Sequence, residues 1–375
     1  MEKVKLTDIC DFQGGSQPPK EEWSFDEQEG YIRMLQIRDF TQGERVTPEY
    51  IKISNTTKMC EANDILIARY GASIGKILTG LAGAYNVAIM RTIPDTSRIK
   101  KLYLYYYLKS PYFQNAILNV GSRAAQAGFN KEDLSKLDIE CPELIKQDKI
   151  IAVLEKLECI IEKRKIELSN LDDLIKARFV EMFGDPATNP MRWSETTIGD
   201  ECFYIKDGPH KSLPDIGKEN GGHPFISVRN IVNGYIDFST ARYISDEDYA
   251  NAIKKCHPEK GDMLYSKGGT TGIAKLIDID EEFANWVHVA VLKFDKSKLN
   301  GIFFENMLNG DYCFEQSQRL TKGIANRDLV LSAMAQIKMY RPPMEIQKQF
   351  ADFVNQVDKS KLYKISTLQF PCIPG

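Results

Sequence analysis

Between Lys146 and Phe183 the chain reads KQDKIIAVLEKLECIIEKRKIELSNLDDLIKARFVEMF, without glycine or proline. Apolar side chains recur along it at alternating steps of four and three residues, which is the a/d pattern of a coiled coil. The seam consists of Ile150, Leu154, Leu157, Ile161, Arg164, Leu168, Leu171, Ile175, Arg178 and Met182, and eight of these ten positions are apolar. We therefore predict one long helix, about 50 Å from Ile150 to Met182 at 1.5 Å per residue.

A seam of this length needs a partner helix, because a single helix in water leaves it exposed. Gly184-Asp185-Pro186 should end the helix, since glycine suits the position after the last turn and proline cannot continue it. Arg164 and Arg178 are polar exceptions on the seam. They can set register or contact a partner, or they can lie where the partner helix has already ended.

Length and composition indicate an ordinary globular protein with more than one domain. The chain has 375 residues, of which 43% are hydrophobic and 27% charged, and its net charge of −3 favours no particular partner. DNA binding would need local basic patches. No export signal or membrane-spanning run is present, so we expect a cytoplasmic protein without a membrane partner. Its eight cysteines are scattered, which predicts free thiols and no metal site.

The sequence on one side of the central helix is repeated on the other, in the same order and about 200 residues later. Four features recur: an alternating strand, a glycine turn, a second strand and a glutamine that precedes an apolar seam. The first copies are Tyr31–Ile37, Asp64–Lys76, Asn86–Arg91 and Gln147, and the second copies are Pro224–Ile231, Asp262–Lys275, Val289–Phe294 and Gln347. The shared order favours a tandem duplication over chance.

We therefore predict an α+β fold in which two mixed α/β domains alternate with two long coiled-coil helices. The expected boundaries are 1–144 for the first domain, 145–184 for the central helix, 185–342 for the second domain and 343–375 for a shorter second helix. On that second helix the seam continues through Phe350, Val354 and Val357, whereas Lys361 falls on its extrapolation. With a partner this short, we expect Leu168–Met182 to be uncovered in the chain alone, free for another subunit or a second copy.

No segment matches a catalytic motif. The turn Gly71–Lys76 has three residues between its glycines and no Ser or Thr after the lysine, so it is not a phosphate-binding P-loop. G-x-S-x-G, H-E-x-x-H and paired C-x-x-C patterns are missing, and the four histidines are scattered. We expect the chain to catalyse nothing.

Two globular halves joined and followed by long helices resemble the specificity (S) subunits of type I restriction–modification systems. The resemblance covers nearly the whole chain. It is most specific at residues 147–186, and next at the two turns Asp64–Lys76 and Asp262–Lys275. It implies that each half is a target recognition domain, which reads one half of a split double-stranded DNA site. It also implies that the helices pair antiparallel, as a spacer and as a docking site for methyltransferase subunits.

The resemblance implies further partners and their cofactors. S-adenosylmethionine, ATP and Mg²⁺ would be bound by the methyltransferase and restriction/translocase subunits, with adenine as the methylated base, and this chain would bind no cofactor. A duplicated reader gives a pseudo-twofold molecule that can place both heads on the same side of DNA. A spacer of about 50 Å would set the half-sites one to two helical turns apart, at about 34–36 Å per turn.

Candidate DNA contacts lie at matched places in the two halves. Glycines let the backbone approach a phosphate, and nearby polar side chains can reach phosphates or base edges. In the first half the candidates are Gln36, Arg38, Arg69, Tyr70, Ser73, Lys76, Arg123 and Gln126. In the second half they are Arg229, Asn230, Ser266, Lys267, Thr270, Thr271, Lys275, Lys322, Asn326 and Arg327. Solvated hairpins with ordinary surface lysines, and structural caps at the strand ends, are the alternatives.

Two other functions remain open at this point. A self-contained nucleic-acid enzyme would need a cofactor or metal motif, and turnover by the isolated chain would reveal it. A coiled-coil interaction scaffold, or a truncated specificity subunit without sequence-specific DNA binding, is compatible with the short second helix. Sequence-selective DNA binding by the assembled complex would distinguish a DNA reader from a scaffold.

Overall fold

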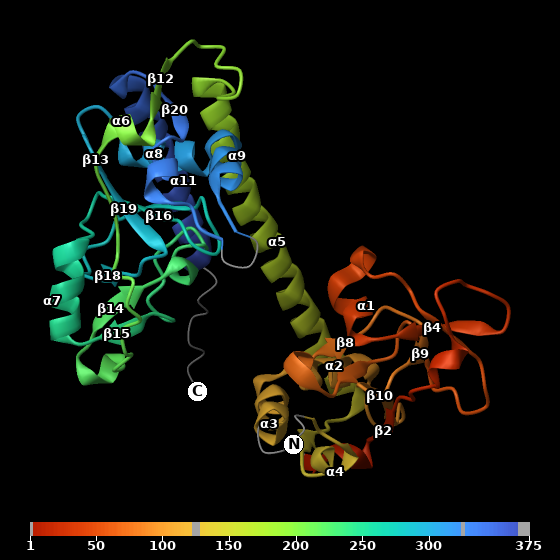
Figure 1. Ribbon diagram of the computed structural model, residues 1–375. Coiled ribbons are helices and arrows are strands. Elements are labelled where there is room, and N and C mark those ends of the chain that lie inside the picture. The colour runs from red at the N-terminus through yellow and green to blue at the C-terminus, as the bar shows by residue number, and fades with distance from the viewer. Residues whose placement is uncertain (1–2, 122–127, 324–326, 367–375) are drawn as a thin grey trace. The chain divides into compact units, whose positions relative to one another are not determined.

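The long central helix is present, in a computed structural model that describes residues 3–121, 128–323 and 327–366 (Figure 1). Helix α5 (Leu144–Phe183) is unbroken and starts slightly earlier than Lys146. It ends at the predicted glycine: Gly184 has a φ of 77°, and its N–H donates to the Val180 carbonyl at 2.8 Å. The chain divides into two compact units, Met1–Glu162 and Lys163–Gly375, so the boundary falls within α5.

The first unit contains three sheets, with strand orders β2-β10-β7-β8, β3-β5-β4-β9-β6 and β1-β11. Its strands are β1 (Lys3–Lys5), β2 (Cys10–Gly14), β3 (Trp23–Ser24), β4 (Tyr31–Leu35), β5 (Tyr50–Lys52), β6 (Met59–Cys60), β7 (Leu66–Ala68), β8 (Ile77–Leu78), β9 (Gly83–Tyr85), β10 (Ile89–Pro94) and β11 (Asp138–Glu140). Its short helices are α1 (Ile37–Gln42), α2 (Lys101–Lys109), α3 (Pro111–Gly121) and α4 (Lys131–Leu134).

The second unit also contains three sheets, with strand orders β13-β19-β16-β17, β15-β14-β18 and β12-β20. Its strands are β12 (Ser194–Thr197), β13 (Cys202–Asp207), β14 (His223–Ile226), β15 (Arg242–Ile244), β16 (Met263–Ser266), β17 (Ala274–Leu276), β18 (Ala284–Asn285), β19 (Val289–Phe294) and β20 (Lys338–Arg341). Its helices are α6 (Ile198–Glu201), α7 (Asp246–Lys255), α8 (Gly301–Asn309), α9 (Asp311–Leu320), α10 (Leu331–Met334) and α11 (Met344–Ser366).

The two units share the topology of their four-stranded sheets and a parallel strand pair, although their second sheets have five and three strands, and this shared part confirms the internal duplication. Each has an antiparallel four-stranded sheet of the same connectivity, and in each a parallel pair joins two strands of a second sheet. In that pair Leu35 lies opposite Tyr85 in the first unit, and Ile226 lies opposite Asn285 in the second. This register makes the two copies comparable residue by residue at the sites described below.

One predicted strand starts later than expected. Residues 86–91 were expected to be extended, but β10 runs from Ile89 to Pro94. The Asn86 side chain accepts a hydrogen bond from the Ala88 N–H at 3.1 Å, and the Asn86 carbonyl accepts one from the Ile89 N–H at 3.0 Å. These local bonds turn the chain before the strand begins, as asparagine often does.

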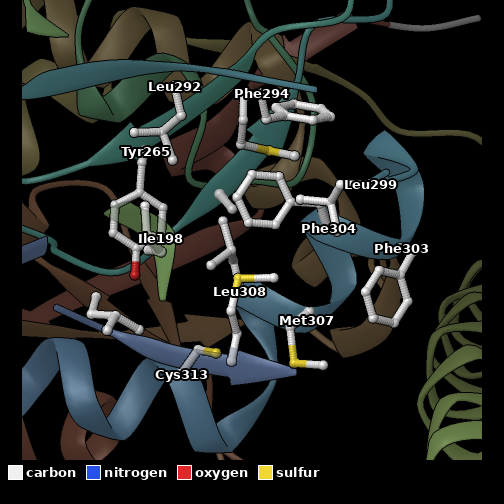
Figure 2. Packing of buried hydrophobic residues seen from close by; sticks show 14 of the residues in the cluster. Ile198, Tyr265, Leu292, Phe294, Leu299, Phe303, Phe304, Met307, Leu308 and Cys313 are labelled. Carbon is white, nitrogen blue, oxygen red and sulfur yellow. The ribbon is translucent and has the colours of Figure 1, made fainter. Parts of the chain in front are cut away.

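Buried strands feed two cores from opposite faces because successive side chains of a strand alternate. In β16, Met263 and Tyr265 enter one apolar cluster, whereas Leu264 enters another. Figure 2 shows the first cluster, in which Tyr265 and Leu292 from the sheet lie near Phe304 from α8. Strands that are covered on both faces carry continuous apolar runs, as the sequence of β16 and β19 does.

A buried glutamine fixes the start of α5 to the first unit. Gln147 has no exposed surface. Its side-chain oxygen accepts the N–H of Lys100 at 2.8 Å, and its amide nitrogen donates to the carbonyls of Arg98 at 2.8 Å and Pro142 at 2.7 Å. The glutamine therefore links the start of α2, the preceding turn and the first turn of the long helix.

The second unit repeats this arrangement at the start of α11. Gln347 is also fully buried. It accepts the N–H of Asn300 at 2.8 Å and donates to the carbonyls of Lys298 at 3.2 Å and Pro342 at 2.7 Å. Each glutamine satisfies backbone groups that have lost water, and such groups are costly to leave unpaired.

We predict that Gln347→Leu destabilises the second unit by about 2–4 kcal/mol, because it leaves one N–H and two carbonyls buried without a partner. Urea unfolding of the full chain measures this. Gln356→Leu on the same helix is the matched control, because that side chain is exposed. Equal stability of the two variants would show that the buried glutamine is dispensable.

Candidate nucleic-acid interface and helix-pairing surface

In the first unit the glycine turn between β7 and β8 carries several of the predicted DNA contacts. Gly71 and Gly75 have φ values of 70° and 80°, which glycine adopts without strain. The Gly75 N–H closes the turn on the Ala68 carbonyl at 2.9 Å. Tyr70 and Lys76 are exposed on this turn, and Ser73 is half-buried.

Arg69 ties this turn to a later loop. Its Nε donates to the Phe129 carbonyl at 3.2 Å, and its guanidinium lies 5.0 Å from the centre of the Tyr70 ring. Tyr70 also forms an isolated bridge with Gly128, where a Cβ would lie 2.3 Å from the ring. The two predicted contact regions of the first unit therefore meet at Tyr70, while Arg123 and Gln126 lie outside the described residues.

The equivalent turn of the second unit is tied to its later loop by a buried lysine. Lys267 is only 5% exposed and forms ion pairs with Asp328 at 2.9 Å and Asp207 at 3.6 Å. The Gly269 N–H also donates to the Arg327 carbonyl at 3.0 Å. Lys267 thus holds the turn and the loop together, and its charge is already matched by two carboxylates.

Three other candidates of the second unit are buried and have partners within the domain. The Ser266 hydroxyl accepts the Ile273 N–H at 2.8 Å, and the hydroxyl of Thr271 lies 2.9 Å from that of Thr321. Asn230 accepts the Ser227 N–H at 2.8 Å. Side chains that are at most 5% exposed cannot reach a base edge in the folded domain, so Lys267 and these three do not belong to the interface that we consider.

The sequence repeat predicts that Lys275 matches Lys76 at the end of the turn, but Lys275 does not lie there. It lies within strand β17, opposite Leu264, where Leu78 lies opposite Leu66 in the first unit. Its ammonium group contacts Glu305 at 3.3 Å. Burial raises the pKa of Glu305, although Lys275 opposes that shift. The turn between β16 and β17 is shorter than the turn between β7 and β8. The lysine that seemed to match Lys76 therefore lies within a strand.

The strand-end candidates divide into caps and exposed arginines. Gln36 caps α1 in a reciprocal pair with Asp39, and it also hydrogen-bonds to Glu49. After β14, Ser227 is the capping residue, and Asn230 holds the place of Asp39 in the same reciprocal pair. The neighbouring Arg38 pairs with Glu49 at 2.5 Å, whereas Arg229 donates to the Thr240 carbonyl. Gln36 and Asn230 therefore have the structural capping role that was the alternative to DNA contact.

The remaining candidates lie at the surface of the later loop and the turn. Arg327 donates to the Gln318 side chain at 2.5 Å, and Lys322 is bridged through its backbone to Asp328. Both are exposed, as is Thr270, while Asn326 lies outside the described residues. The exposed candidates, which we call the exposed reader set, are Arg38, Tyr70, Lys76, Arg229, Thr270, Lys322 and Arg327.

Sequence reasoning missed three residues beside the reader set. Trp286 and His288 line a cavity of about 620 Å³ together with Arg229 and Arg327, and Arg242 lines an adjoining cavity with Trp286. Arg242 lies on β15, and Trp286 and His288 follow the short strand β18, which carries no recognisable motif. The only available signal was their position in the repeat, just before the strand that begins at Val289.

The tyrosines of α2 have structural roles. The hydroxyls of Tyr103 and Tyr107 donate to the carbonyls of Glu140 and Asp138, each at 2.9 Å. Tyr106 donates to Glu158 on α5 at 2.9 Å. Desolvation and this bond raise the pKa of Tyr106 to about 12. These bonds attach α2 to β11 and to the early part of α5.

Helix α11 packs antiparallel against the C-terminal part of α5. Phe350, near the start of α11, lies 5.4 Å from Phe179 and 5.5 Å from Phe183, measured between ring centres. Lys361, near its end, pairs with Asp172 at 2.7 Å. Contacts therefore run in opposite directions along the two helices. The predicted seam residues in this shared core are Leu171, Ile175, Met182, Phe350, Val354 and Val357.

The uncovered part of the seam is the opposite half from the one expected. Leu168–Met182 was predicted to lack a partner, but from Leu171 onward this half packs on α11 and α8. Because α11 starts at the second domain and runs antiparallel, its contacts begin at the C-terminal end of α5 and extend back to Leu171 and Asp172. Lys361 also does not end the packing, since it pairs with Asp172 instead.

We call this earlier part the open seam, and it lies on the turns of α5 that precede Arg164. Ile160 and Ile161 are 40% and 46% exposed, and Leu154 and Leu157 are half-buried. Val153 beside them is 59% exposed. Ile150 and Leu168, which flank the open seam, are also half-buried.

Comparison with known proteins places the chain in a family. The family described as "Type I restriction modification DNA specificity domain" matches residues 1–170 and 190–368. These two matches cover most of the chain, so it belongs to this family. Within the described residues, no helix has the length and apolar character needed to cross a membrane, and no cluster of His, Cys, Asp and Glu is arranged to hold a metal ion.

Two curated relatives come from Methanocaldococcus jannaschii. The type I restriction enzyme MjaVIII specificity subunit is 22% identical, over 95% of this chain and 86% of the relative. The MjaIX specificity subunit is 23% identical, over 79% of this chain and 72% of the relative.

Two solved structures share the fold. One is the S subunit of a type I restriction–modification system from M. genitalium, with a TM-score of 0.50, 16% identity and coverage of 98% of this chain and 91% of that one. The other comes from work on complex assembly and conformational transition of the type I system, with a TM-score of 0.52, 17% identity and coverage of 98% and 93%.

We predict that Phe350→Ala destabilises the second unit by about 3–5 kcal/mol, because it opens a cavity where α5, α8 and α11 meet. Thermal or urea unfolding measures the loss. Phe203→Ala is the matched control, since Phe203 is 75% exposed in the same unit. A loss below that of the control would mean that the helix pair does not depend on this ring.

Proposed function

We propose that this chain is the DNA-recognition subunit of a type I restriction–modification complex, in which each unit reads one half of a split, asymmetric double-stranded DNA site. The observation that carries the proposal is the repeated topology, in which matched surface positions hold different residues. The repeated backbone fold sets the positions of the DNA-contacting residues. The side chains that reach base edges determine which bases each unit recognises. In this proposal the chain supplies recognition and no catalytic group.

The exposed reader set supports two different half-sites. On the turns, Tyr70 of the first unit corresponds to Gly268 of the second, because each forms the bridge to the later loop. Lys76 corresponds to Ile273, since the carbonyls of both accept the matching strand N–H. Two domains with one backbone and such different side chains should prefer different bases.

The proposal assigns the chemistry to partners. Methyltransferase subunits would bind S-adenosylmethionine and modify adenine, and a restriction/translocase subunit would bind ATP and Mg²⁺. Such a complex works on cellular DNA, so the proposal places the chain in the cytoplasm. The helices α5 and α11 would serve as the coiled-coil spacer between the target recognition domains.

The open seam supports a docking role for the central helix. Its apolar side chains are exposed or half-buried in the chain alone, and such a stripe on a charged helix is typical of a helix-binding surface. An apolar stripe is also the feature that an interaction scaffold without DNA binding would need. The scaffold is therefore the second candidate function, and the DNA experiment separates the two.

We expect co-expression with the methyltransferase subunit to produce modified adenines at a single split motif, mapped across the host genome. Combined Tyr70→Ala and Lys76→Ala changes should relax or abolish the requirement at one half of the motif, because a lost base contact costs about 1–3 kcal/mol. The unchanged half of the motif is the internal control. Methylation at unrelated sites, or none in a complex shown to be assembled, would favour the scaffold.

We predict that Ile161→Asp weakens binding of the methyltransferase subunit by at least about tenfold, since it places a charge in an apolar contact. Co-purification and calorimetry with the full chain measure this. Ile166→Asp is the control, because Ile166 is 53% exposed on a different face of the same helix. If both variants bind alike, the open seam is not the docking surface.

A further inference from the structure

A cavity in the second unit lies among residues that neither the motifs nor the seam explains. It has a volume of about 620 Å³, and Trp286 and His288 form part of its wall. The two rings meet edge to face, with centres 4.8 Å apart. Gly268 makes room for this wall, because a Cβ at that position would lie 2.0 Å from His288 Nδ1.

Three arginines surround this cavity and the one that adjoins it. Arg229 and Arg327 line the main cavity, and Arg242 lies 5.9 Å from the centre of the Trp286 ring. All three are exposed. The contacts of their guanidiniums are the Thr240 carbonyl, the Gln318 amide oxygen and the Ser212 hydroxyl.

The positive charge of these arginines is not neutralised by ion pairs. Among the described residues, none of the three guanidiniums forms a salt bridge with a carboxylate. Asp328, the acid on the cavity wall, is paired with Lys267 at 2.9 Å. The nearby Asp215 accepts backbone N–H groups from Tyr243 at 2.9 Å and Gly217 at 3.1 Å. Most guanidinium N–H donors therefore remain available for an anion.

The rings of the wall offer further unused nitrogen atoms. Trp286 Nε1 and His288 Nδ1 are shielded from solvent, and neither has a hydrogen-bond partner among the described residues. Buried polar groups in native proteins nearly always have partners, so two orphans on one wall need an explanation. The indole N–H can only donate, and thus it calls for an acceptor.

The matched place in the first unit lacks this chemistry. By the register of the parallel strand pairs, Asn86 corresponds to Trp286 and Ala88 to His288. Arg38, which corresponds to Arg229, is neutralised by Glu49 at 2.5 Å. Among the described residues, therefore, the cationic cavity belongs to the second unit and has no counterpart in the first.

We propose that this cavity seats a phosphodiester group of the DNA backbone and anchors the second recognition domain on its half-site. The proposal rests on the DNA-recognition function proposed above. A cavity fits a group that protrudes from DNA, and phosphates protrude, whereas base edges lie at the bottom of a groove about 8.5 Å deep. Guanidiniums supply charged donors to an anion. Phosphate contacts set register without carrying sequence information.

The test measures DNA binding by the full chain assembled with its methyltransferase subunits, on a duplex that contains the mapped motif and on an unrelated duplex. We expect Arg229→Ala to weaken binding to both duplexes by the same factor, roughly tenfold at 50 mM salt. The slope of log K against log salt should fall by about 0.9, so the loss at 200 mM salt should be about 3.5 times smaller.

An arginine of the second unit outside the reader set supplies the matched control. Arg319→Ala removes an exposed arginine that already has a carboxylate partner, Glu315 at 2.7 Å, and it should leave the salt slope nearly unchanged. The proposal is overturned if Arg229→Ala leaves the salt slope at the wild-type value, or if it relaxes preference at one base pair while binding to the unrelated duplex is unaffected. The second result would make Arg229 a base reader. A wild-type complex without sequence preference would refute the proposed function. The change in salt slope caused by Arg229→Ala would still show whether the cavity binds a phosphate.

Discussion

The buried glutamine at the start of each long helix is the interaction on which the arrangement depends. Gln147 and Gln347 each accept one backbone N–H and donate to two carbonyls in their own domain. Because the same three bonds recur, each helix leaves its domain from an equivalent point. In the second unit this fixes α11 against the incoming end of α5, and the contacts of Phe350 and Lys361 follow from it. Removal of one glutamine would strand three backbone groups, not a single contact.

Sequence patterns predicted the features that depend on periodicity. The heptad seam gave the extent of α5, and the ordered repeat gave two domains of one topology. Side-chain burial was not predictable in the same way. Lys267 was expected at the surface, but two carboxylates that are distant in sequence surround it. Lys275 was misplaced because the two turns differ in length, and a shift of one or two residues moves a side chain between turn and strand.

The error about the helix seam has a different cause. The sequence showed that the second helix is short, but the uncovered half depends on the end from which its partner starts. That end is set by the attachment of α11 to the second domain through Gln347, which is a tertiary contact. The reading surface shows a similar limit. Tyr70 packs against Gly128 in one unit, while His288 packs against Gly268 in the other, so different strands and loops supply the ring beside equivalent turns.

The division of α5 between the units also bears on the order in which the chain can fold during synthesis. The first unit is complete by Glu162, and its closing strand β11 ends at Glu140. It can therefore assemble before the second unit has been made. Phe179 and Phe183 must wait for Phe303 and then for Phe350, which come much later on the ribosome. Until then this end of the helix exposes aromatic rings, so the nascent chain passes through a stage in which chaperone binding competes with aggregation.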